Sequence, residues 1–200
     1  MTIDVYLAEL ERALPWAPRL RRRLLVEVED HLRSSAEAVG EDEAVARFGA
    51  PADVARGFHP AYARGYRAAA ALALLAALVA LFALLYPVPE NTLPAAPWRE
   101  DAKPSTLAWK QDAMLVLFGA AVALGVLTAI VRRKTTWLTG ATAAAIIACA
   151  GVGAALAIDW SAAVPGTPWL WLALGSAVPV VLALAATALV ARAARLASAA

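Results

Sequence analysis

The sequence predicts an all-α membrane protein, with a small helical domain at the N-terminus followed by a four-helix transmembrane region. Hydrophobic residues make up 62% of the chain and charged residues 17%, a balance typical of a small integral membrane protein. Residues 1–59 show helical periodicity without strand-like alternation. Beyond them, four long stretches carry no charged residue: Ala68–Pro89, Ala113–Val131, Thr135–Ile158 and Trp160–Ala191.

Each of these stretches is long enough to cross a bilayer as a helix, which takes roughly 20 apolar residues. We expect the spans at about 68–87, 113–131, 138–158 and 170–191. Basic residues fall at every second break between them: Arg64 and Arg67, then Arg132, Arg133 and Lys134, then Arg192 and Arg195. By the positive-inside rule, this pattern predicts a multi-pass protein of the cell (inner or plasma) membrane with both termini in the cytoplasm.

Helix start and stop residues divide the N-terminal region. The first helix is expected over Ile3–Leu14, where apolar residues recur at i, i+3, i+4 and i+7. The second is expected over Pro18–Val39, because proline favours the first turn of a helix and Gly40 favours its end. Its buried face would hold Leu20, Leu24, Val28, His31 or Leu32, and Ser35.

Two shorter helices are expected next. One begins after Asp42 as its N-cap and ends at Phe48-Gly49. Another begins at Pro51 and ends near Phe58, because His59-Pro60 predicts a break. Residues 60–67 would then form a juxtamembrane helix or linker, and 68–200 the transmembrane region.

The core of the N-terminal domain should be thin, as it is in most domains below about 70 residues. The apolar residues able to supply it are Tyr6, Leu7, Leu10, Leu24, Leu25, Val28, Leu32, Val45, Phe48, Val54 and Phe58.

These residues resemble a known family. Tyr6-Leu7 with Leu10, the run Glu-x-x-Asp-His-Leu from Glu27 to Leu32, and Arg47-Phe48-Gly49-x-Pro51 are similar to the HTH-associated α-helical signalling (HAAS) domain, which is close to the permease prefix domain. The resemblance covers roughly Asp4 to Phe58. It implies a helical domain fused to transmembrane helices, often encoded beside a PadR-type winged-helix repressor, with no catalytic residues attributed to it.

Six residues of the second helix are candidates for binding a partner or lipid: Arg19, Arg21, Arg22, Arg23, Glu27 and His31. Two interpretations stay open for this run. It is either a solvated helix face with i, i+4 ion pairs such as Arg23–Glu27, or a surface that contacts lipid phosphates or an acidic partner.

Metal binding and catalysis have little support. Glu27 and His31 stand one helical turn apart and could share a metal, but no third ligand accompanies them and His59 stands alone. Cys149 is the sole cysteine, which excludes disulfides and thiol-clustered metal sites. Nucleophile-elbow, phosphate-loop and zinc-protease patterns are absent from the sequence. We therefore expect no cofactor and no enzymatic activity.

Ionisable residues avoid the middle of every predicted span, whereas transport pathways usually need such groups. Asp159 should be interfacial, and the loop from Val88 to Lys110 a connector outside the cell. The formal net charge of +2 is too small to argue for direct nucleic-acid binding. We expect a signalling or regulatory protein whose N-terminal domain binds a cytoplasmic protein, which the resemblance suggests is a PadR-type regulator. The alternative is an accessory or prefix module of a permease.

Overall fold

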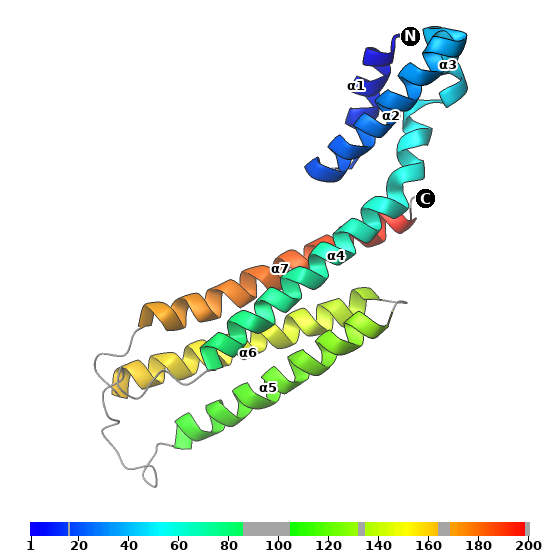
Figure 1. Cartoon of the computed structure of the whole chain (residues 1–200). Helices are drawn as coiled ribbons and strands as arrows, with labels where there is room; N and C mark the ends of the chain where they lie inside the picture. The colour runs from blue at the N-terminus through cyan, green and yellow to red at the C-terminus, as the bar shows by residue number, and fades with distance from the viewer. Residues whose placement is uncertain (16, 86–104, 132–134, 164–168, 199–200) are drawn as a thin grey trace. The chain divides into compact units, whose positions relative to one another are not determined.

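The computed structural model describes residues 1–15, 17–85, 105–131, 135–163 and 169–198 (Figure 1). These ranges contain seven helices and no strand, which confirms the predicted all-α fold. The chain divides into two compact units. We call Met1–Tyr66 together with Arg192–Ala200 the head unit, and Arg67–Ala191 the membrane unit.

The first two helices begin and end close to where the sequence predicts. Helix α1 spans Ile3–Ala13 and α2 spans Pro18–Val39. The Thr2 hydroxyl caps α1 by accepting a hydrogen bond from the Val5 N–H at 3.4 Å. On α2 the buried side chains are Leu24, Val28 and Leu32, whereas His31 is exposed. Of the two alternatives predicted for the buried face, His31 and Leu32, it is Leu32 that is buried.

Helix α3, Glu41–Phe48, begins before the predicted N-cap at Asp42. Its N-cap is Gly40, whose φ of 88° is a conformation that favours glycine. Asp42 lies in the first turn and accepts a hydrogen bond from the Met1 ammonium at 2.8 Å. This hydrogen bond lowers the pKa of the Asp42 carboxyl and raises the pKa of the ammonium. The predicted cap was wrong because this carboxylate binds a group distant in the sequence.

A single helix, α4, spans Pro51–Leu85 and contains Pro60. The break predicted at His59-Pro60 is therefore wrong, and residues 60–67, expected as a juxtamembrane helix or linker, are helical within α4. Proline inside a helix removes one backbone hydrogen bond and typically costs about 3 kcal/mol. Burial on both sides of Pro60 offsets this cost, because Ala55, Tyr62 and Ala63 are all buried.

The head unit has a compact core in which Tyr6, Leu10, Leu32 and Tyr62 are fully buried. Six of the predicted core residues are buried: Tyr6, Leu10, Leu24, Val28, Leu32 and Val45. The other five, Leu7, Leu25, Phe48, Val54 and Phe58, are half-buried. The prediction missed Ile3, Leu14, Ala44, Ala55, Tyr62, Ala63 and Tyr66, which are buried as well.

The Tyr6 hydroxyl is buried and has no hydrogen-bond partner among the described residues, and its burial raises the pKa of Tyr6.

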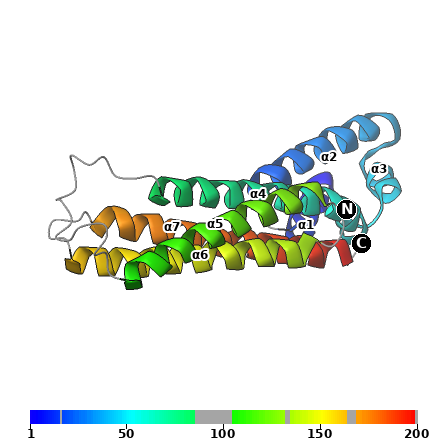
Figure 2. The ribbon, with the colours of Figure 1, turned by 90° about the horizontal axis from the view of Figure 1, so that it is seen from below.

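The membrane unit is formed by parts of α4 and α7 with α5 (Ser105–Ile130) and α6 (Thr135–Ala163); α7 spans Trp169–Ser198. Four helical stretches are long and apolar enough to cross a membrane: Pro51–Ala83, Trp109–Ile130, Thr136–Asp159 and Ala173–Ser198. Each overlaps one predicted span. Within this unit the helices run alongside one another in both views (Figures 1 and 2). Small residues dominate the buried cluster, which allows the close helix approach common in membranes.

Helices α5 and α6 form an antiparallel hairpin whose register is fixed by three contacts. Towards the end of α5 and the start of α6, the Thr128 and Thr142 hydroxyl oxygens lie 3.1 Å apart. Further along, the Cys149 thiol donates to the Met114 carbonyl oxygen at 3.5 Å. At the far end, Lys110 forms an ion pair with Asp159. Lys110, expected in a connector, is therefore helical, and Asp159, expected to be a simple interfacial residue, is ion-paired.

We expect Asp159→Asn to destabilise the membrane unit, because it leaves the Lys110 ammonium without its partner. The two side chains are 18% and 35% exposed, so the loss should be about 1–3 kcal/mol, below the 3–5 kcal/mol typical of fully buried pairs. Thermal unfolding in detergent measures this loss. Asp112→Asn, at an exposed position of α5, is the matched control. Exchanging the two charges should restore most of the stability; equal melting of both single variants would show that the pair contributes nothing.

Candidate functional site

All six predicted site residues lie on α2, and five of them are exposed: Arg19, Arg22, Arg23, Glu27 and His31. Arg21 is only half-exposed, because its guanidinium reaches Glu11 Oε1 of α1 at 3.5 Å. Arg21 therefore links α1 to α2. Among the described residues of the set, it is the one with an ion pair to another helix.

Three of the exposed residues follow one another at i, i+4 spacing along α2, and we call Arg23, Glu27 and His31 the α2 stripe. Arg23 Nε donates to Glu27 Oε1 at 3.0 Å, as the sequence predicts for this pair. Both side chains are largely exposed, so the pair adds little to stability and stays accessible to a partner. The stripe thus presents a cation, a carboxylate and an imidazole in a row on the surface.

The α2 stripe ends against α3. The His31 and Phe48 ring centroids lie 5.7 Å apart, and the Phe48 ring also meets the Tyr6 ring edge-on at a centroid distance of 5.9 Å. Phe48 is the last residue of α3, and Gly49 follows it with a φ of 94°, which turns the chain into α4. A half-buried aromatic ring therefore lies beside the exposed imidazole. Apolar surface next to charged groups is a composition common in protein interfaces.

A metal site is not formed by these residues. Within the described ranges no three His, Cys, Asp or Glu side chains come close enough to hold an ion. Glu27 binds Arg23, and His31 contacts the Phe48 ring.

A second group of arginines within the head unit, on α4 and α7, was not predicted from the sequence. Leu20, in the first turn of α2, lies 3.9 Å from the position that a Cβ on Gly65 would occupy, so this turn packs on α4. On α4 and α7, the Arg192 guanidinium lies 5.5 Å from the centroid of the Tyr66 ring. Three arginines interpreted from the sequence only as topology signals, Arg64, Arg192 and Arg195, thus share one unit with those of α2. Periodicity carries no signal for this contact between segments far apart in the sequence.

Fold and surface together define a class of protein, a small helical domain joined to helices long and apolar enough to cross a membrane. Residues 6–57 match the family model for HAAS. The match begins in α1 and ends in the first part of α4, inside the head unit. The chain therefore carries a HAAS domain. No curated protein and no solved structure matches it.

Proposed function

We propose that the chain is an integral membrane protein of signalling or regulation whose head unit faces the cytoplasm and binds a protein there. The partner we propose is a transcription regulator of the PadR type, and the role is binding rather than catalysis. The HAAS match to residues 6–57 is the observation that carries this proposal. Its orientation is supported by the arginines on the head side of the apolar helices.

The α2 stripe with Phe48 is the surface we assign to this partner. The three residues of the α2 stripe are not used in the core, which α2 enters through the adjoining residues Leu24, Val28 and Leu32. An imidazole, a carboxylate and a guanidinium offer both donors and acceptors, so they can select a partner by charge. The regulator would then be held at the membrane by contacts with one helix face.

The test measures binding of a purified PadR-type regulator to the full chain in detergent. Glu27→Ala combined with His31→Ala removes two members of the α2 stripe, and we expect affinity to fall about tenfold or more, as for interface anchors worth at least 1.4 kcal/mol. Glu9→Ala with Arg12→Ala is the matched control, since both residues are exposed on α1 outside the stripe. We expect this control to bind like the wild type.

Two results would contradict the proposal at different levels. Equal affinity of the wild type and the Glu27/His31 variant would remove the α2 stripe as the binding surface. Absence of binding by the wild type itself would remove the PadR-type regulator as the partner. Amide hydrogen exchange of α1–α3 confirms in each case that the variants are folded.

A further inference from the structure

Charge is separated along α2 within the head unit. Its first turns carry Arg19 and Arg22, which are exposed and form no ion pair with any described carboxylate. The opposite end of the helix leads into the acidic first turn of α3, Glu41–Glu43. A helix of 22 residues is about 33 Å long, so the basic and acidic ends are well separated. The basic end is therefore a distinct surface.

Contacts inside the head unit place this basic end beside the last turns of α4 before its charge-free stretch. Leu20 packs at Gly65, because its Cδ2 lies within van der Waals distance, 3.9 Å, of the position that a Cβ on Gly65 would occupy. Gly65 precedes Ala68, the first residue of the charge-free stretch, by three residues of continuous helix. Three residues rise about 4.5 Å, which is within the thickness of a lipid headgroup layer. The contact between Leu20 and Gly65 therefore lies within one headgroup thickness of the start of the charge-free stretch.

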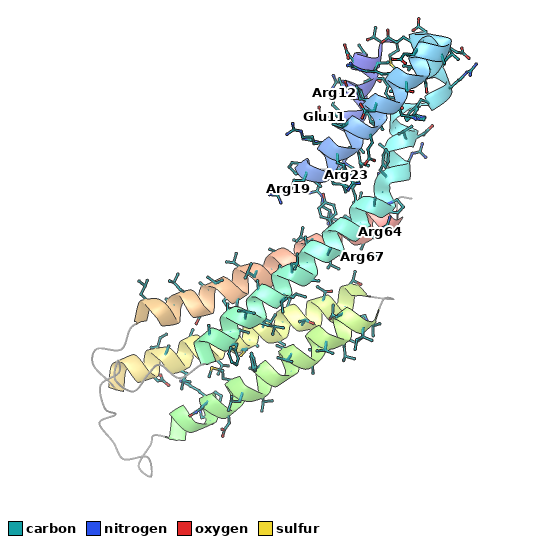
Figure 3. The ribbon with its side chains drawn as sticks, in the orientation of Figure 1. Glu11, Arg12, Arg19, Arg23, Arg64 and Arg67 are labelled. Carbon is teal, nitrogen blue, oxygen red and sulfur yellow. The ribbon has the colours of Figure 1, made fainter. Side chains whose placement is uncertain are left out.

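Other cations of the head unit belong to the same part of α4 and to the end of α7. Arg64 is exposed on α4 one residue before Gly65. Arg192 lies over the Tyr66 ring, and Arg195 is exposed one turn further along α7. We name this set the basic collar: Arg19, Arg22, Arg64, Arg192 and Arg195. Figure 3 labels Arg19 at the start of α2 and Arg64 on α4.

We propose that the basic collar binds the phosphate groups of anionic phospholipids in the bilayer surface at which α4 enters. Guanidinium groups bind phosphate oxygens in a bidentate geometry, and basic residues next to a span are attracted to anionic lipid. A bilayer surface fits better than an acidic protein, because Arg64 on α4 and Arg192 over the Tyr66 ring adjoin the point where the sequence of α4 becomes apolar. The α2 stripe is not part of the collar, so this inference is independent of the partner proposed above.

Binding of the collar would hold the start of α2 against the lipid. The test uses the full chain in lipid nanodiscs, with a fluorescent dye on Ala13→Cys in a Cys149→Ala background. Ala13 is exposed at the end of α1, just before the connection to α2. A quencher attached to lipid headgroups reports how close this end comes to the bilayer. Discs of phosphatidylcholine alone are compared with discs that also contain phosphatidylglycerol.

We expect stronger quenching in the anionic discs, and loss of the difference in roughly 1 M salt, where charges are screened within about 3 Å. Arg19→Gln with Arg22→Gln should abolish most of the difference, because each arginine near an anionic surface contributes about fivefold to binding. Arg19→Lys with Arg22→Lys should retain it. Arg33→Gln with Arg47→Gln removes equal charge from exposed positions outside the collar and should leave the difference intact.

Equal quenching of the wild type in neutral and anionic discs would overturn the proposal. The proposal is also overturned if the Arg33/Arg47 variant loses as much of the difference as the Arg19/Arg22 variant, since the effect would then reflect net charge alone. If the Arg19/Arg22 variant keeps its lipid response but no longer binds a soluble acidic protein that the wild type binds, the collar is a protein-binding surface. The assignment to lipid is then wrong.

Discussion

Leu32→Ala is expected to unfold the head unit. Leu32 is 0% exposed, and truncating a fully buried leucine costs about 2–5 kcal/mol. A domain of this size rarely has more than about 3–5 kcal/mol of stability from its core. Amide hydrogen exchange in α1–α3, measured on the full chain in detergent, should therefore rise to the rate of unfolded peptide while exchange in α5 and α6 stays slow.

The matched control for this experiment is Val26→Ala on the same helix. Val26 is 49% exposed, so its truncation should leave exchange nearly unchanged. Equal exchange in the two variants would mean that α2 packs through another face. The full chain is needed because residues 1–59 alone would lack Tyr62 and Tyr66, both of which are buried in the head unit.

The second large effect concerns topology, where the outcome is all or none. In a Cys149→Ala background, Thr92→Cys should react with a membrane-impermeant maleimide on intact cells, and Thr136→Cys only after the cells are opened. This follows from the basic residues at every second break. Thr92 lies outside the described residues, whereas Thr136 is exposed at the start of α6.

Cys149 is buried, so the unsubstituted chain should react slowly and supplies the background measurement. The reversed labelling pattern would place the head unit outside the cell and remove the proposal of a cytoplasmic partner. Labelling of both positions from the same side would remove the predicted crossing between them.

Local signals explain which parts of the fold the sequence predicts well. Pro18 and Gly40 act on their own turns through fixed dihedral preferences, and α2 begins and ends where they place it. Pro60 has an equally strong local preference, yet α4 continues through it. Pro60 differs from Pro18 in its tertiary contacts, because buried side chains on both sides of Pro60 stabilise the helix. The sequence by itself shows the proline but not that packing.

In the candidate site, too, contacts within one helix can be predicted from the sequence and contacts between helices cannot. Spacing alone predicts the Arg23–Glu27 pair, because i and i+4 residues adjoin on any helix. Spacing cannot show that Arg21 reaches Glu11 on α1, or that the start of α2 packs at Gly65. In the membrane helices the limit is different. Apolar residues cover every face, so periodicity does not tell which face meets protein and which meets lipid.

The head unit contains residues from both ends of the described chain, and this has a consequence for how the protein is made. Tyr66 and Arg192, which contact each other, are separated by the whole membrane unit. At usual rates of translation, on the order of 10 s passes between the synthesis of the ring and the synthesis of its cation. During that interval the first domain of the nascent chain still lacks the end of α7, so the contact between Tyr66 and Arg192 forms only after the membrane unit has been synthesised.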